Sequence, residues 1–207
     1  SKLSASLASA GIPILILIYM TIAFTFRSFS QPVLLVLLVP LSITGVAWGH
    51  WIHNFPLNIL SILGIIALIG IMVNDGLVLI GKFNNNLRAG LSFNQALIDA
   101  GKSRFRAIFL TSVTTVAGLA PLILEKSRQA QFLKPMAIAV SYGIAFATLL
   151  TLIVLPIFLS YNNQIKVYFE WLKSGDFPSK EAVERAIIEQ NEQDKTQEIQ
   201  SSNTQNA

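Results

Sequence analysis

The chain has 207 residues, of which 53% are hydrophobic, and it carries a formal net charge of +4. Its long apolar runs exclude an ordinary soluble domain and indicate an all-α integral membrane protein. Eight of its eleven acidic residues lie in the last 38 positions, so a basic body precedes an acidic tail. This charge balance gives no reason to expect nucleic-acid binding. The lack of cysteine excludes disulfide bonds and cysteine metal sites.

Five apolar stretches are long enough to cross a bilayer, and polar turns separate them. The first follows only one basic residue, Lys2, and four more spans come after it, which is atypical of a signal peptide. Because the chain starts at Ser1 rather than at methionine, we interpret it as the C-terminal piece of a longer protein, with 1–6 ending an extracytoplasmic region. Pro40 predicts a kink in the second span. The expected spans are 7–26, 32–52, 57–81, 107–124 and 135–161.

Two segments outside the spans have patterns of their own. Ser92 and Gln95 have the spacing of a capping box, and apolar residues then share one helical face as far as Gly101. This pattern predicts a short amphipathic helix over 93–101, lying on the cytoplasmic membrane surface. The segment 162–207 is polar, and its end, rich in Gln, Asn and Ser, predicts a largely disordered cytoplasmic tail.

Basic residues predict the orientation of the chain in the membrane. If the chain starts outside, the inner segments carry eight Lys and Arg residues and the outer segments carry four. An excess of positive charge marks the cytoplasmic side, so the C-terminus is expected in the cytoplasm. The inner set is Arg27, Lys82, Arg88, Lys102, Arg104, Arg106, Lys166 and Lys173, and the outer set is Lys2, Lys126, Arg128 and Lys134.

The sequence carries no motif of a soluble enzyme, since GxGxxG, Walker A, HExxH and a Ser-His-Asp set are all missing. His50 and His53 lie beside Trp48 and Trp51 at the end of the second span, and we expect them to be solvated at the membrane–water interface. A pH-sensitive role is the alternative. Two histidines without a third ligand support a metal site only weakly. Neither a catalytic nor a metal site is therefore predicted.

The third span contains the most costly residue of the chain. Asp75 and its neighbour Asn74 lie inside 57–81, where an aspartate costs roughly 2.5–3.5 kcal/mol on insertion scales. Such residues usually face a polar partner or a path for protons or ions. A carboxylate held between apolar surroundings and a nearby cation can take up and release a proton. Proton or ion handling is the favoured interpretation, and polar contacts that hold helices together are the alternative.

Polar and small residues form a stripe on the fourth span, at positions i, i+3, i+4 and i+7. Arg104 precedes the stripe by seven residues and extends the same face. It is the candidate cation for the carboxylate of the third span, directly or through a water, and Thr111 is the candidate hydrogen-bond partner. Close helix packing is the other explanation of the stripe. Its members are Thr111, Thr114, Thr115 and Gly118.

Four stretches of the chain together resemble the C-terminal membrane half of resistance-nodulation-division (RND) efflux permeases. The resemblance covers residues 7–161 and implies that the five spans are the last five of twelve transmembrane helices. The remaining seven helices and two large extracytoplasmic domains would belong to the missing N-terminal part. The four stretches are FRSFSQPVLLVLLVPLSITGVAWGHW, GIMVNDGLVLIGKFN, RFRAIFLTSVTTVAGLAPL and EKSRQAQFLKPMAIAVSYGIAFATLLTLIVLPIF.

The resemblance also implies a function. Members of the family are multi-pass proteins of the bacterial inner membrane that export hydrophobic or amphiphilic compounds, or metal ions. Proton entry drives them, so the proton motive force takes the place of a cofactor. The implied partners are the lipid bilayer, the N-terminal half, two further copies in a homotrimer, a periplasmic adaptor and an outer-membrane channel. A lipid-exporting or sodium-coupled relative, a non-transporting membrane scaffold and an inactive fragment are the alternatives.

A proton relay at defined positions is part of what the resemblance implies. By motif position, Asp75 and Asn74 fall on the first of two relay helices, and Arg104 and Thr111 fall on the second. Many drug-efflux members carry lysine where this chain has Asn74. A neutral amide cannot form that salt bridge, so the titrating role passes to Asp75. The partner carboxylates would lie in the N-terminal half, and the supporting stripe comprises Thr114, Thr115 and Gly118.

Overall fold

The computed structural model describes residues 13, 16, 17, 19–21, 23 and 30–205. The first expected span, 7–26, lies for the most part outside the described residues. Every regular element that the structure describes is helical. From residue 30 onward these are α2 (Ser30–His53), α3 (Ile59–Arg88), α4 (Phe93–Leu124), α5 (Arg128–Leu149), the π-helical turn η1 (Leu150–Val154), α6 (Leu155–Ser174) and α7 (Arg185–Gln205).

Four helical segments of the described chain are long and apolar enough to cross a membrane. They correspond to the expected spans that begin at residues 32, 57, 107 and 135. The all-α, multi-pass membrane architecture is therefore confirmed for this part of the chain. The segments are Gln31–His53, Ile59–Arg88, Phe93–Leu124 and Arg128–Ser174.

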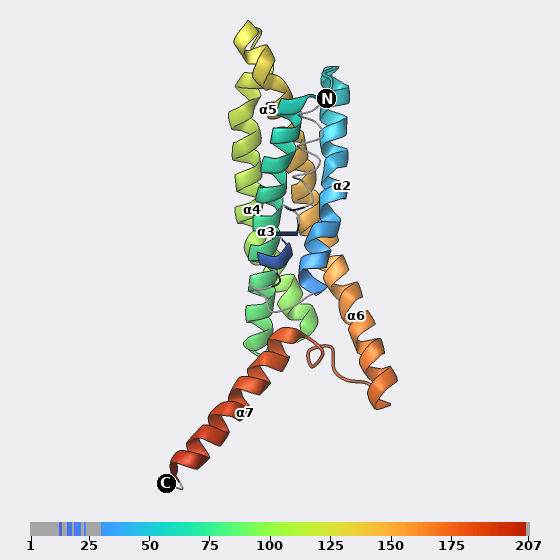
Figure 1. Cartoon of the computed structure of the whole chain (residues 1–207), viewed down its shortest axis with the longest axis vertical. Coiled ribbons are helices and arrows are strands. Elements are labelled where there is room, and N and C mark those ends of the chain that lie inside the picture. The colour runs from blue at the N-terminus through green and yellow to red at the C-terminus, as the bar shows by residue number, and fades with distance from the viewer. Residues whose placement is uncertain (1–12, 14–15, 18, 22, 24–29, 206–207) are drawn as a thin grey trace.

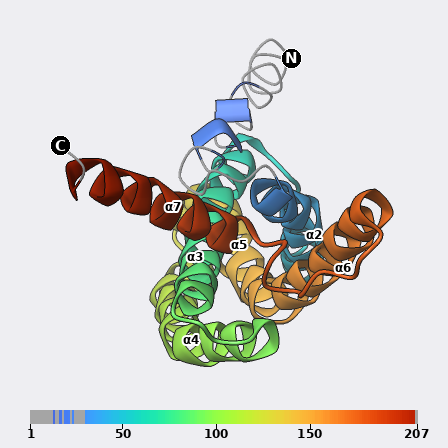
Figure 2. The same cartoon turned by 90° about the horizontal axis from the view of Figure 1, so that it is seen from below.

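The helices α2, α3, α4 and α5 stand side by side in one bundle, and α6 continues below it from the end of α5 (Figure 1). Seen from below, α5 lies among the other three (Figure 2), and it packs against each of them. The bundle interior is apolar, and Leu38, Leu68, Leu79 and Ile138 are fully buried. A small residue permits a close approach of α3 to α5, because a Cβ at Gly64 would lie 2.9 Å from the Met136 carbonyl oxygen.

Local interactions define where α3 begins and where the chain turns after it. At its start, the Asn58 side chain accepts a hydrogen bond from the Ser61 N–H at 3.0 Å, and the Ser61 hydroxyl accepts one from the Asn58 N–H at 3.3 Å. These reciprocal bonds form a capping box. After its last turn the chain reverses at Gly90, which has a φ of 84°. Helix α4 begins three residues later and therefore runs antiparallel to α3.

The expected short helix over 93–101 is not a separate element. Helix α4 runs unbroken from Phe93 to Leu124, so the prediction that Gly101 ends a helix is wrong. A glycine inside a helix costs only about 1 kcal/mol, and that cost is too small to break a helix anchored on both sides. The first turns of α4 bury Phe93, Ala96 and Ala100. They pack against the end of α3, where the Phe93 and Phe83 rings meet edge to face at 5.3 Å.

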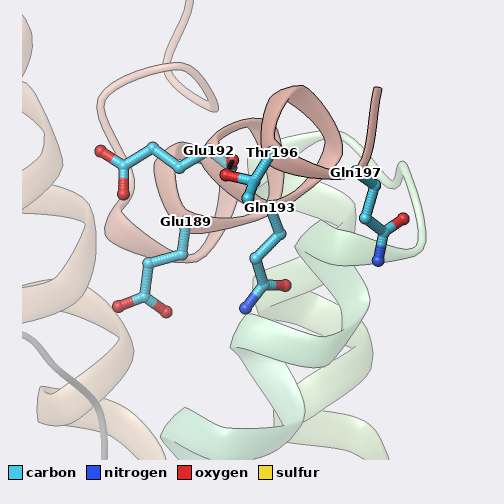
Figure 3. A pocket seen from close by; sticks show the side chains of 5 residues that line it. All are labelled: Glu189, Glu192, Gln193, Thr196 and Gln197. Carbon is cyan, nitrogen blue, oxygen red and sulfur yellow. Dashed lines mark hydrogen bonds between the residues drawn. The ribbon is translucent and has the colours of Figure 1, made fainter. Parts of the chain in front are cut away.

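The polar tail is also more ordered than its composition predicts. Helix α6 continues to Ser174, and α7 runs from Arg185 to Gln205, where disorder was expected. Gln, Glu, Lys and Arg favour helix, and the Arg185–Glu189 pair at 3.5 Å supports the first turn of α7. The helix then extends away from the bundle (Figure 1). A pocket of about 290 Å³ lies on it. Figure 3 shows the side chains that line this pocket, which are Glu189, Glu192, Gln193, Thr196 and Gln197.

Three glutamates at the start of the tail, Glu181, Glu184 and Glu189, connect the lower ends of three helices. We call them the acidic clamp. Glu181 Oε1 accepts a hydrogen bond from the Phe93 N–H at 2.6 Å, which satisfies a free donor at the start of α4. Glu189 binds Arg88 of α3 at 3.2 Å. Buried Glu184 binds Lys166 of α6 at 2.9 Å and accepts a hydrogen bond from the Asn163 Nδ2 at 2.8 Å.

Replacement of the buried glutamate tests the clamp. Glu184→Gln removes the charge that binds Lys166 and replaces one of the two acceptor oxygens with a donor, so that either Lys166 or Asn163 loses its acceptor. We expect a stability loss of roughly 1–3 kcal/mol, because a buried polar group then lacks its partner. Thermal unfolding of the intact protein in detergent measures this loss. Glu192→Gln, on the exposed face of α7, is the control and should unfold as the wild type does.

Candidate proton-relay site

Asp75 lies near the middle of α3, on the edge of the face that packs into the bundle. Its neighbours on the inner side are buried, and a Cβ at Gly76 would contact Leu35 of α2. The Asp75 side chain is half-buried, and Asn74 is exposed. The structure gives Asp75 no hydrogen bond or ion pair with another described residue. The carboxyl group thus sits inside a membrane span, facing a side that these helices do not cover.

The antiparallel pairing of α3 and α4 brings the predicted residues to similar depths. At about 1.5 Å per residue, Asp75 lies roughly 20 Å from the end of α3 at the connecting turn. On α4, Arg104 lies roughly 17 Å and Thr111 roughly 27 Å from that same turn. The depth of Asp75 therefore falls between those of the predicted cation and the predicted hydroxyl partner. The described contacts include no direct bond among the three side chains.

The threonine stripe of α4 faces away from the helices that α4 packs on. Ile108 and Ser112 are buried, and the Ser112 hydroxyl pairs with Thr148 of α5. The stripe lies on the other side, where Thr111 and Thr114 are exposed, Thr115 is half-buried, and a Cβ at Gly118 would meet no described atom within 4 Å. Each threonine hydroxyl donates to a carbonyl one turn earlier, at 2.8–3.0 Å. Packing within this part of the chain therefore does not explain the stripe.

Arg104 is half-buried, and its Nε is a buried donor without a hydrogen-bond partner in the described part of the chain. A guanidinium group carries five donors and no acceptor, so this Nε is a hydrogen-bonding group that the described contacts leave unsatisfied. The expected contact with Asp75 is not a direct ion pair here. Arg104 and Asp75 instead lie at similar depths on neighbouring helices, with Arg104 between the buried residues Ala100 and Ile108 of α4.

Several buried polar contacts could not be identified from the sequence. Gln31 of α2 and Asn84 of α3 exchange two side-chain hydrogen bonds, at 3.0 and 3.2 Å. Asn84 sits in the run KFNNN, where Asn86 is also buried and Asn85 is exposed, and nothing in the sequence distinguishes the three amides. Ser112 and Thr148 are hydroxyls inside membrane spans, but each span carries other hydroxyls, so the sequence did not indicate that these two would pair. These pairs hold helices together and do not reach Asp75.

The prediction that His50 is solvated is wrong. His50 is 4% exposed, and its Nδ1 donates to the Val46 carbonyl at 3.0 Å. Its Nε2 then accepts from the Ser61 hydroxyl at 2.7 Å in the neutral ring. The tight turn between α2 and α3 buries this histidine by bringing the capping serine against it. His53 is partly buried and bonds to the Tyr142 hydroxyl at 3.1 Å. Among the described residues, no group of His, Cys, Asp and Glu could hold a metal ion.

Comparisons with known proteins agree on the family. SwrC, the swarming motility protein of Bacillus subtilis, is 30% identical over 142 residues, covering 68% of this chain and 14% of SwrC. The cobalt-zinc-cadmium resistance protein CzcA of Cupriavidus metallidurans is 29% identical over 143 residues, covering 69% of this chain and 14% of CzcA. The chain thus spans about one seventh of the length of these relatives.

A solved structure and a family profile extend the match. The crystal structure of a heavy metal efflux pump superimposes with a TM-score of 0.69 at 28% identity, over 77% of this chain and 16% of the pump. The profile of the AcrB/AcrD/AcrF family matches residues 2–161. That range holds the Asn74–Asp75 pair, the threonine stripe and the helices that position them. The chain belongs to the AcrB/AcrD/AcrF family of RND efflux permeases.

Proposed function

We propose that this chain is the C-terminal, proton-translocating part of a proton-driven RND exporter, and that Asp75 gains and loses the transported proton. The observation that carries the proposal is a half-buried carboxyl group in the middle of a membrane helix, without a partner among the described residues. Such a group is retained where it serves a proton or ion path. The uncovered side of α3 and α4 is where the rest of a protein about seven times longer would pack.

The other residues support Asp75 in separate ways. Arg104 supplies positive charge at a similar depth and favours the ionised carboxylate whenever water or a side-chain movement connects them. Thr111 offers a hydroxyl further along the same face. Asn74 can form hydrogen bonds but carries no charge, so it leaves the titration to its neighbour. Thr114, Thr115 and Gly118 let a neighbouring helix approach α4 closely.

In this proposal the protein lies in a bacterial inner membrane with its C-terminus in the cytoplasm. The count of basic residues supports that orientation, and it places Arg104 and the acidic clamp on the cytoplasmic side. The intact protein assembles as a homotrimer with a periplasmic adaptor and an outer-membrane channel. The proton motive force supplies its energy, so its function requires no bound cofactor.

We further propose that the exported compounds are hydrophobic or amphiphilic. A second candidate, the export of divalent metal cations, is favoured by the cobalt-zinc-cadmium resistance protein and the heavy metal efflux pump to which the chain is similar. Proteoliposomes containing the intact protein distinguish the two. Export of a hydrophobic dye without export of Zn²⁺, Co²⁺ or Cd²⁺ supports the first candidate, and the reverse result supports the second.

The coupling ion is tested with the same vesicles. An imposed pH gradient should drive export with sodium replaced by choline on both sides, and an ionophore that collapses the gradient should abolish it. Export that requires a sodium gradient and ignores the pH gradient would contradict proton coupling.

Arg104→Ala should lower proton-coupled export without abolishing it, because the cation assists the carboxylate and is not the proton carrier. Thr111→Ala should have a smaller effect, since the loss of one neutral hydrogen bond corresponds to about 0.5–1.5 kcal/mol. Initial export rates under a fixed pH gradient measure both effects. Lys102→Ala is the control for Arg104, as an exposed cation on the same helix, and it should export like the wild type.

A further inference from the structure

A pocket of about 390 Å³ lies between α2, α4 and α5, at the end of the bundle where α4 ends and α5 begins. Ligand pockets have volumes of about 300–1,000 Å³, with mostly apolar walls and a few polar groups. This pocket follows that pattern. Its α4 wall is apolar, and its other walls carry three polar side chains. The residues that line the pocket include Val116, Ala120 and Ile123 of α4, Ser141 and Tyr142 of α5, and His53 of α2.

One polar group in the pocket wall has no partner. Ser141 is only 2% exposed, and its hydroxyl is buried. This hydroxyl makes no hydrogen bond to any described residue. The other two polar side chains of the pocket have a hydrogen-bond partner, because the His53 ring and the Tyr142 hydroxyl bond to each other at 3.1 Å. Buried hydroxyls elsewhere on α4 and α5 are paired, as Ser112 is with Thr148. An occupant that satisfies Ser141 must therefore be apolar and carry one hydrogen-bonding group.

The surroundings of the pocket indicate the chemistry of the occupant. Its walls belong to helices that cross the membrane, so bilayer lipids have access to it. Trp48 and Trp51 are exposed near the same end of α2, as is typical of the membrane–water interface. The loop that follows the pocket residue Leu124 carries the exposed basic residues Lys126 and Arg128, which can bind a phosphate group.

We propose that this pocket binds one acyl chain of an anionic phospholipid, with the ester carbonyl accepting a hydrogen bond from the Ser141 hydroxyl. The lipid headgroup then points toward the loop that carries Lys126 and Arg128. The volume accommodates one chain and leaves the second chain in the bilayer. This site is distinct from Asp75 and requires only that α2, α4 and α5 lie in a membrane. It goes beyond the proposed proton role and does not depend on it.

Photolabelling of the intact protein tests the site. The protein is reconstituted in vesicles of phosphatidylcholine and phosphatidylglycerol, the latter carrying a diazirine next to the ester of one chain. After illumination, mass spectrometry maps the labelled peptides. We expect labels on residues 116–124 and 141–145. The same result is expected in the Asp75→Asn variant without any pH gradient, so that the outcome is independent of export.

Pocket variants and controls make the test specific. Ser141→Ala should reduce this labelling roughly threefold to tenfold, as the loss of one hydrogen bond predicts, and Ser141→Thr should restore it. Ala145→Leu fills the pocket and should reduce labelling at least as strongly. Leu149→Phe, at an exposed position of α5 outside the pocket, should label like the wild type. Circular dichroism confirms that each variant keeps its helical content.

Two further outcomes decide the assignment. Moving the diazirine to phosphatidylcholine, or combining Lys126→Gln with Arg128→Gln, should weaken the labelling if the lipid is anionic. Equal labelling in all these conditions would overturn the anionic lipid. Labels that miss both peptides, or that persist unchanged in Ser141→Ala and Ala145→Leu, would overturn the site itself and indicate that another part of the protein fills the pocket.

Discussion

Asp75→Asn in the intact protein is expected to abolish proton-coupled export while leaving membrane insertion intact. The substitution keeps the size and hydrogen-bonding capacity of the side chain and removes only its ability to release a proton. Asn74 already shows that an amide is accommodated at this depth of α3. Substrate-driven proton flux, followed with a pH-sensitive dye inside proteoliposomes, should fall to the level of protein-free vesicles.

The matched control is Asn74→Ala, which alters the adjacent side chain and leaves the carboxyl group in place. It should retain most of the proton flux, because Asn74 is exposed and its uncharged amide only assists the carboxyl group that carries the proton. Asp75→Glu is the conservative variant and should keep part of the flux. Wild-type flux in Asp75→Asn, measured in protein of normal stability, would show that another group carries the proton.

Substitution of Gly64 is expected to lower the stability of the protein strongly. A Cβ at this position would lie 2.9 Å from both the Met136 carbonyl oxygen and the Ala139 Cβ of α5, so the two helices must separate. Overpacking of a tight interface costs about 1–3 kcal/mol, and here a backbone atom blocks relaxation. Gly64→Ala should lower the unfolding midpoint clearly, and Gly64→Leu should prevent recovery of folded protein.

Substitution of a second glycine is expected to raise the stability of the protein. Gly101 lies inside α4, and a Cβ there would meet no described atom within 4 Å. Gly101→Ala should therefore stabilise the protein by up to about 1 kcal/mol, through helix propensity alone. Thermal unfolding of both alanine variants in the same detergent makes the comparison. Equal shifts in the same direction would refute the close approach of α3 and α5 at Gly64.

The spans and the exceptional aspartate could be predicted from the sequence, because both depend on local composition. A run of apolar residues identifies a membrane helix, and a single carboxyl group inside it is conspicuous. The same holds for the threonine stripe, whose spacing alone places Thr111 and Gly118 on one face. The local pattern wrongly predicted that a helix ends at Gly101. The packing of Phe93 against Phe83 stabilises the start of α4, and this outweighs the weak tendency of a glycine to end a helix.

Long-range contacts account for the other differences. His50 is buried because Ser61, on the next helix, comes to lie against it. The tail is helical near its start because Glu184 and Glu189 find basic partners on α6 and α3. Composition cannot reveal such pairs, since their members are separated by up to a hundred positions. In the proposed relay the partners of Asp75 would come from the N-terminal half of a longer transporter, and the sequence of this chain cannot reveal them.

The central claim, that Asp75 itself takes up the proton, is tested most directly by infrared difference spectroscopy of the intact protein at varied pH. Protonation of a carboxylate creates a carboxylic acid C=O band that isotope labelling of aspartate assigns. The wild type should show such a band on acidification, with intensity that follows proton-coupled export, and Asp75→Asn should lack it. An identical band in Asp75→Asn would contradict the assignment of Asp75 as the proton carrier.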